Sequence, residues 1–156
     1  MFMAVFVPLR KPMAARYWGI RESDLVYSAA KIFFAYGLGN AMTFPMSVGA
    51  TTLLLAGRPT PDVVLEILTD ERPTLFCGVP TLFSAMLAAL GGDDRIESAL
   101  RLCISAGEAL PSAVGEGWLA KTGVDILDGV GSTEMLHIFL SNRCLLYTSP
   151  SPRDTA

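Results

Sequence analysis

The stretch TLFCGVPTLFSAMLAALGG, residues 74–92, decides the expected fold. Its first four residues form a short β-type run, which Gly78 and Pro80 interrupt. The apolar residues that follow recur at helical spacing on one face, and the glycine pair ends the helix. These apolar residues are Leu82, Phe83, Met86, Leu87 and Leu90. A strand followed directly by an amphipathic helix is the repeating unit of a parallel sheet.

The same unit recurs on both sides of this stretch. Strands are expected at residues 25–28, 50–55, 74–77, 100–105 and 124–127. The run at 50–55 is continuously apolar, as in strands buried on both faces. Thr60-Pro61-Asp62 opens one helix, with Thr60 as its N-cap, and Pro111 opens another. The pattern predicts an α/β fold with a mostly parallel sheet and flanking helices.

Composition limits the kinds of protein that this chain can be. It is 51% hydrophobic and 17% charged, whereas soluble domains average about 25% charged residues. A membrane protein and the interior of a larger protein both fit these values. No run approaches the ~18 consecutive apolar residues of a spanning helix, which favours the second interpretation and predicts no membrane partner. A net charge of −3 without a basic cluster argues against nucleic acid as a partner.

The cysteines and the histidine indicate a reducing compartment and no structural zinc. Cys77 and Cys103 lie in apolar runs, and Cys144 leaves the total odd, without a CxxC pair. Buried free thiols of this kind favour a cytoplasmic protein. A single histidine, His137, cannot complete a zinc site without a cysteine cluster.

Two loops follow neighbouring strands of the expected sheet, at residues 106–110 and 128–134. Ligands bind outside the carboxyl ends of parallel strands, so these loops are expected to lie side by side at a binding site. In the second, Gly129 and Gly131 allow close approach of a planar ligand. Thr133 offers a hydroxyl to a phosphate oxygen, and Glu134 offers a hard oxygen ligand to Mg²⁺. The alternative is a turn before a helix that Ser132 caps, with Glu134 in its first turn.

The sequence Gly-Ser-Thr-Glu at residues 131–134 resembles the nucleotide motif of adenylate-forming enzymes, which include acyl-CoA ligases. The resemblance implies catalytic roles for Thr133 at the phosphates and for Glu134 as the magnesium ligand, with Ser132 also at the nucleotide. It also sets three residues beside the adenine: Asp128, Gly129 and Val130. Valine departs from the family's commoner aromatic residue, which puts stacking on the base in doubt.

The loop Ser105-Ala106-Gly107-Glu108-Ala109-Leu110-Pro111 resembles the family's other nucleotide loop. Gly107 and Glu108 would then border the adenosine. An ordinary strand-to-helix turn is the alternative. The spacing of the two loops, one helix and one strand apart, makes the pair more specific than either loop alone.

Residues 28–40 and 131–139 resemble the benzoate-CoA ligase form of the acyl pocket. The resemblance implies an aromatic-ring slot lined by Ala35, Tyr36, Gly131, His137 and Ile138. A small apolar slot with few polar groups suits a benzene ring. The alternatives are that Phe33, Phe34 and Tyr36 are simple core residues and that the histidine is structural.

The resemblance covers residues 16–143 and implies part of the large N-terminal domain of such an enzyme, an AMP-binding domain. Benzoate or 4-hydroxybenzoate would be activated with ATP and Mg²⁺ to an acyl-adenylate and then transferred to CoA. The family's phosphate loop, ribose-binding aspartate and catalytic lysine are not recognised here, so this chain is expected to be inactive alone. A non-catalytic adenylate-binding or interaction module is the alternative from another functional class.

The two ends of the chain match nothing in this resemblance. Residues 1–15 are unassigned, with a non-native start as one interpretation. Residues 144–156 contain Ser-Pro-Ser-Pro and are predicted to be a non-native, disordered tail.

Overall fold

The computed structural model describes residues 18–91, 95–134 and 137–143. The predictions for residues 1–15 and 144–156, and the role of Gly92 as a helix end, lie outside the described residues. The described strands are β1 (Leu25–Ser28), β2 (Thr51–Leu53), β3 (Leu75–Gly78), β4 (Leu102–Ala106), β5 (Ile126–Gly131) and β6 (Ile138–Arg143). The helices are α2 (Ala35–Leu38), the π-helical η1 (Gly39–Thr43), α3 (Phe44–Val48), α4 (Pro61–Asp70), α5 (Pro80–Ala89) and α6 (Ser112–Thr122).

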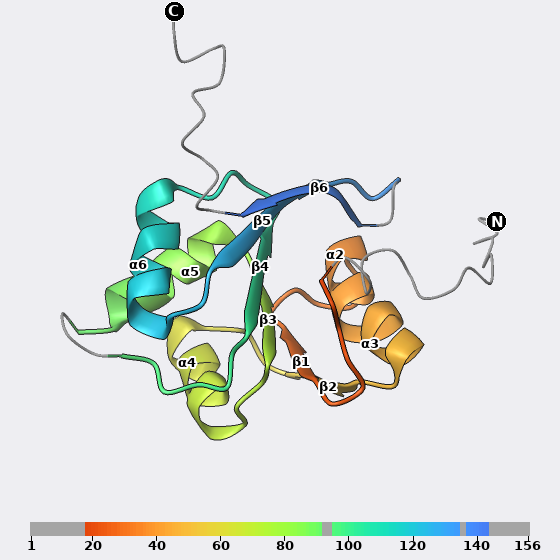
Figure 1. Cartoon of the computed structure of the whole chain (residues 1–156), viewed down its shortest axis with the longest axis horizontal. Helices are drawn as coiled ribbons and strands as arrows, with labels where there is room; N and C mark the ends of the chain where they lie inside the picture. Colours follow the sequence, from red (N-terminus) through yellow and green to blue (C-terminus); the bar gives the residue numbers. More distant parts are fainter. Residues whose placement is uncertain (1–17, 92–94, 135–136, 144–156) are drawn as a thin grey trace, which may run out of the picture.

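The strands form one sheet in the order β2-β1-β3-β4-β5-β6 (Figure 1). Every neighbouring pair from β2 to β5 is parallel, and only β6 runs antiparallel to its neighbour. Parallel neighbours require crossover connections, which the helices between the strands provide. The prediction of an α/β fold with a mostly parallel sheet is confirmed.

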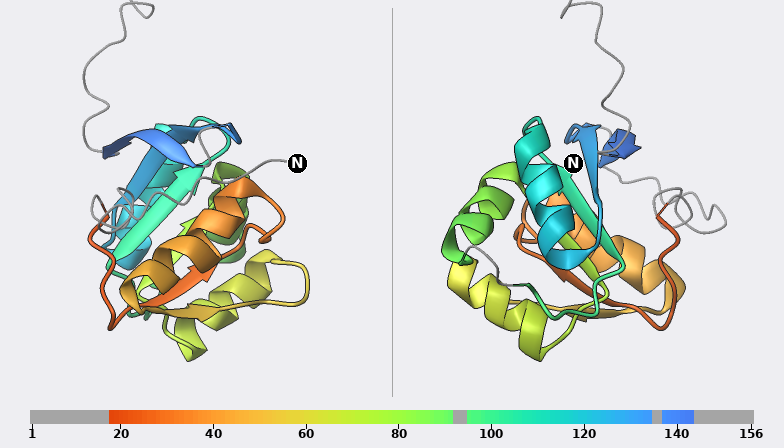
Figure 2. Two further views of the ribbon diagram at one scale, coloured as in Figure 1. Left: turned by 90° about the vertical axis from the view of Figure 1, so that its right-hand side faces the viewer. Right: turned by 60° about the vertical axis from the view of Figure 1, so that its left-hand side comes forward.

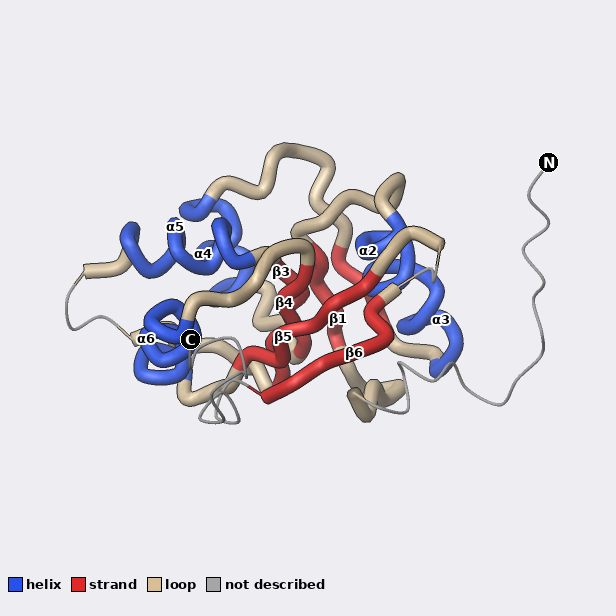
Figure 3. Tube along the Cα trace, turned by 90° about the horizontal axis from the view of Figure 1, so that it is seen from above, coloured by secondary structure: helices blue, strands red, loops and turns tan. Residues whose placement is uncertain are grey.

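Helices cover both faces of the sheet. α4, α5 and α6 pack side by side on one face, and α2, η1 and α3 lie on the other (Figure 3). Figure 2 shows the two layers from either side, with α2 and α3 in front of the strands on the left and α6 in front on the right. None of the helices in the described part of the chain has the length and apolar character needed to cross a lipid bilayer.

Side chains alternate between the two faces along each strand, which divides the core into two layers. Tyr27, Phe76, Cys103 and Ile126 are in register across four strands and all face the α4–α6 layer. Trp118 closes this layer, and its indole N–H lies 3.3 Å from Cys103 Sγ. Because successive side chains of a strand point to opposite faces, the same strands contribute residues to both core layers.

β2 corrects one prediction. The apolar run at residues 50–55 suggested a strand buried on both faces, but β2 covers only Thr51–Leu53 and Leu54 is 65% exposed. Among the described strands, β2 pairs with β1 alone and forms one edge of the sheet. Apolar composition therefore did not distinguish a central strand from an edge strand.

β5 is longer than expected. The sequence pattern ended this strand at Leu127, whereas pairing with β6 extends it to Gly131. The alternative of a helix capped by Ser132 is wrong, because Ser132 to Glu134 connect two antiparallel strands. Hydrogen bonding to β6, an antiparallel strand later in the chain, extends β5 beyond the residues that the local sequence pattern predicted.

Candidate functional site

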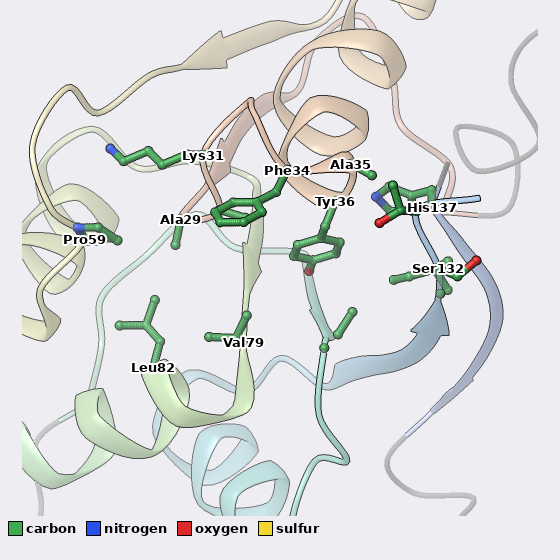
Figure 4. Close-up of a pocket in the computed structure, with 16 residues that line it drawn as sticks. Ala29, Lys31, Phe34, Ala35, Tyr36, Pro59, Val79, Leu82, Ser132 and His137 are labelled. Carbon is green, nitrogen blue, oxygen red and sulfur yellow. The ribbon is translucent and has the colours of Figure 1, made fainter. Parts of the chain in front are cut away.

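A cavity of about 630 Å³ opens at the carboxyl ends of the parallel strands (Figure 4). Its lining comes from the ends of β4 and β5, the connections after β1, β3, β4 and β5, the segment before α4, the helices α2 and α5, and the start of β6. The lining residues are Ala29, Ala30, Lys31, Phe34, Ala35, Tyr36, Pro59, Val79, Leu82, Ala106, Gly107, Gly131, Ser132, Thr133, His137 and Ile138. The size is typical of a small-molecule site.

The strand order explains the position of this cavity. The chain leaves β1 toward β2 on one side, and β3 takes the place on the other side of β1. Connections after β1 and β3 therefore diverge to opposite faces, and a crevice forms where the order reverses. Lys31 after β1 and Val79 after β3 both line the cavity at this point.

The two loops expected at one edge do lie side by side. β4 and β5 pair with Ser105 opposite Asp128 and Ala106 opposite Gly129. Gly107 and Thr133 consequently line the same cavity. Gly107 has φ +100°, a conformation that side-chain-bearing residues rarely adopt.

Five of the residues assigned by resemblance do not line the cavity: Glu108, Asp128, Gly129, Val130 and Glu134. Asp128 is buried, and its Oδ2 accepts a hydrogen bond from the Leu110 N–H at 3.2 Å. This contact links the two loops directly. Val130 is 57% exposed, which leaves its side chain outside the core.

Glu134 is exposed beside the cavity. A backbone N–H and the Ser132 hydroxyl hold the pKa of its carboxyl below the usual value. The carboxyl is therefore ionised at neutral pH and can supply oxygen ligands to a cation. In the described residues, no three histidine, cysteine or acidic side chains gather to hold a metal ion.

The five residues assigned to an aromatic-ring slot all line the cavity. Ala35 and Tyr36 come from α2, Gly131 ends β5, His137 lies in the β5–β6 connection and Ile138 begins β6. Tyr36 lies between Phe34 and His137 in Figure 4, and its ring stacks on the imidazole at a centroid distance of 5.3 Å. The Tyr36 hydroxyl turns to the sheet and is shared between the carbonyls of Gly78 and Ile104, each at 3.1 Å.

Burial raises the pKa of the Tyr36 hydroxyl well above its usual value. The phenol therefore stays protonated, and its ring, not its oxygen, faces the cavity. Neighbouring Phe33 is 77% exposed and Phe34 is 58% exposed. The interpretation of these two phenylalanines as core residues is wrong, because both lie before α2 with their side chains exposed.

His137 is buried among aromatic rings. Trp18 and Phe44 contact it edge-on, at centroid distances of 5.2 and 4.6 Å. Burial lowers the pKa of His137 to about 4, and the nearby Tyr36 backbone opposes this shift only in part. The cavity is thus bordered by a neutral imidazole with one donor and one acceptor.

Several lining residues were not identified from sequence, among them Lys31, Pro59, Val79 and Leu82. Lys31 and Val79 directly follow or adjoin strand ends, which was the available signal. Pro59 precedes α4, and no sequence pattern linked it to this site.

Comparisons with known proteins agree with this architecture. A family model described as "AMP-binding enzyme" matches residues 5–155. Benzoate–CoA ligase of Thauera aromatica is 62% identical over 125 residues, which cover 80% of this chain and 24% of that protein. The 4-hydroxybenzoate–CoA/benzoate–CoA ligase of Rhodopseudomonas palustris is 55% identical over 130 residues, covering 83% of this chain and 24% of that protein.

Solved structures give the same result. The benzoate CoA ligase of Burkholderia xenovorans LB400 matches with a TM-score of 0.76 and 60% identity, covering 80% of this chain and 26% of that one. The anthranilate CoA ligase AuaEII in complex with anthranoyl-AMP matches with a TM-score of 0.76 and 43% identity, covering 85% and 27%. The chain spans about a quarter of the length of these relatives.

Proposed function

This chain belongs to the AMP-binding enzyme family, and we propose that it forms part of an aryl-CoA ligase. The proposed substrates are a small aromatic carboxylic acid, benzoate or 4-hydroxybenzoate, together with ATP and CoA. The observation that carries the proposal is one continuous cavity. It joins the two loops bearing Gly107 and Thr133 to the apolar end formed by Tyr36, His137 and Ile138.

The apolar end suits a flat ring. Tyr36 and Ile138 present apolar surface, and Gly131 has no side chain to obstruct the ring. A Cβ at Gly131 would lie 2.6 Å from the His137 carbonyl oxygen, so the close approach of the two strands depends on glycine. Neutral His137 adds a hydrogen-bonding group without adding charge. The proposed orientation directs the ring toward His137 and the carboxylate toward Thr133.

The loop residues suit a nucleotide and its magnesium ion. Mg²⁺ is commonly bound through one or two carboxylates and the phosphates of the substrate, not by a cage of protein side chains. Glu134, exposed and ionised beside the cavity, fits that requirement. The ion would lower the charge on the phosphates during attack. Thr133 would donate its hydroxyl hydrogen to a phosphate oxygen, and Gly107 would border the adenosine.

The proposed reaction has two balanced steps. A carboxylate oxygen of the acid bonds to the α-phosphorus of ATP, and the bond to pyrophosphate breaks. The thiol sulfur of CoA then bonds to the acyl carbon, AMP leaves, and the thiol proton passes to solvent. Because the chain spans about a quarter of its relatives, we propose that it does not complete these steps alone.

Cys77 and Cys103 are free buried thiols, which supports a cytoplasmic location.

The test compares the complete protein that contains this chain with variants at the nucleotide loop. Release of pyrophosphate and formation of acyl-CoA are measured with benzoate, 4-hydroxybenzoate and acetate. Glu134→Gln is expected to lower kcat about 100-fold, since it removes the carboxylate proposed to hold Mg²⁺ at the phosphates. Glu116→Gln, an exposed carboxyl on α6, serves as the matched control and retains activity.

Two outcomes would contradict the proposal. Turnover with acetate but with no aryl acid would exclude an aryl-CoA ligase. AMP binding by the complete protein without release of pyrophosphate from ATP would indicate a non-catalytic adenylate-binding module instead.

A further inference from the structure

The cavity has a second end that none of the expected substrate or nucleotide residues occupies. In Figure 4, His137 and Ser132 lie at one side of the cavity, and Lys31, Pro59 and Leu82 lie at the other. Most of the lining at this second end is apolar. Lys31 is the single charged residue that the described lining contains.

One wall of the second end comes from an exposed segment. Pro59 lies in residues 54–60, between β2 and α4. Leu54 is 65% exposed, and residues 56–58 are exposed as well. Leu55 packs against the core, but residues 56–58 bury little apolar surface and gain little order from packing. The position of Pro59 therefore depends on polar contacts.

Lys31, in the connection after β1, supplies such a contact. Its ammonium group donates hydrogen bonds to the carbonyl oxygens of Leu55, at 2.6 Å, and Gly57, at 2.5 Å. Lys31 follows β1, whereas both acceptors follow β2, so the contact joins the ends of two neighbouring strands. Hydrogen bonds from an ionised donor are stronger than those between neutral groups.

We propose that Lys31 is a positioning residue for the cavity: its ammonium group fixes residues 55–57 and thereby the wall that Pro59 forms. Lys31 itself also lines the cavity, so one residue sets two adjoining parts of the wall. Which ligand contacts this wall depends on the proposed function, whereas the ordering of residues 55–57 by Lys31 does not.

The first test measures backbone order by ¹⁵N relaxation on the chain. In the unmodified chain, the amides of Ala56 and Gly57 are expected to be as ordered as those of α4. Lys31→Met keeps an apolar stem and removes the donors, and the order parameters of these two amides are expected to fall below about 0.6. Lys31→Arg, which restores charged donors, is expected to recover most of the order.

Arg58→Met is the matched control, because it removes a positive charge from the same segment without removing the contact to the two carbonyls. It is expected to leave Ala56 and Gly57 ordered. The proposal is overturned if these amides stay as ordered in Lys31→Met as in the unmodified chain, or if Arg58→Met loosens them equally.

The second test measures the binding of benzoate with AMP to the complete protein that contains this chain, with and without Lys31→Met. Lys31→Met is expected to weaken binding roughly 2- to 10-fold, because residues 55–57 must then become ordered when the ligand binds. Unchanged affinity would overturn the role of Lys31 in the cavity. If the complete protein that contains this chain does not bind benzoate with AMP, the proposed function fails, while the amide measurements still decide whether Lys31 holds the segment.

Discussion

The Tyr36 hydroxyl donates to the carbonyl oxygen of Gly78, 42 residues further along the chain, at 3.1 Å. This bond, shared with the Ile104 carbonyl, attaches α2 to the end of β3 and the middle of β4. It also orients the ring that stacks on His137. A single hydroxyl thus connects the stability of two central strands with the shape of the cavity.

Tyr36→Phe is expected to lower the free energy of unfolding by about 1 kcal/mol, because two buried carbonyls lose a shared donor. Tyr27→Phe is the matched control. The Tyr27 hydroxyl is buried without a hydrogen-bond partner among the described residues, so its removal is expected to be neutral or stabilising. Urea unfolding of both variants measures the difference. Equal losses in the two variants would contradict a stabilising role for the Tyr36 bond.

Asp24 and Arg101 form an ion pair at the opposite end of the strands from the cavity. From this pair we expect the stability of the fold to decrease in acid. Burial alone would raise the pKa of Asp24, but Arg101, the Arg21 N–H and the Thr74 hydroxyl outweigh it and lower that pKa. A carboxyl with a lowered pKa in the folded state stabilises the protein above its unfolded pKa of about 4. That stability is lost as the pH falls through the folded value.

Asp24→Asn is therefore expected to cost about 2 kcal/mol at pH 7, since it removes a buried, hydrogen-bonded charge. Unfolding by urea at pH 7 and at successively lower pH measures the gap between variant and unmodified chain, which is expected to narrow in acid. Glu97→Gln, at an exposed carboxyl, is the control. A gap that is independent of pH would exclude ionised Asp24 as the source.

His137 offers a direct pH measurement because it is the single histidine in the sequence. Its ring proton signals are expected to titrate with a midpoint of about 4 in the folded chain, because burial disfavours the imidazolium. In denaturing urea, the midpoint is expected near 6.5, the usual histidine value. The folded state thus loses stability as the pH falls from about 6.5 toward 4, since the unfolded chain binds the proton more readily. A folded midpoint near 6.5 would contradict the burial of this side chain.

Gly131→Ala is expected to destabilise the chain by about 1–3 kcal/mol, as in other overpacked sites. A Cβ at this position would lie 2.6 Å from the His137 carbonyl oxygen and 2.9 Å from Ile138 Cα, and backbone atoms cannot easily move aside. Gly57→Ala is the control, because a Cβ there meets no atom within 4 Å. Thermal unfolding distinguishes the two. A Gly131→Ala chain as stable as the Gly57→Ala chain would show that β6 can move away from β5 at little cost.

Much of the fold was readable from local patterns. β1 begins and ends where the sequence predicted, and α4 begins at Pro61 after Thr60. The two loops after β4 and β5 were correctly expected to be neighbours, because parallel strands bring their carboxyl ends to one edge. The roles assigned to the residues of those loops remain predictions.

The sequence by itself determined the order of strands and helices and the apolar face of each, because periodicity is a property of neighbouring residues. Only the tertiary structure decided that β2 is an exposed edge, that β5 continues into a hairpin with β6, and that Lys31 reaches the carbonyls after β2. It also paired Asp24 with Arg101 across 77 positions. These features depend on which strands become neighbours and on which groups then meet at their ends, and neither is encoded in the spacing of residues along one element.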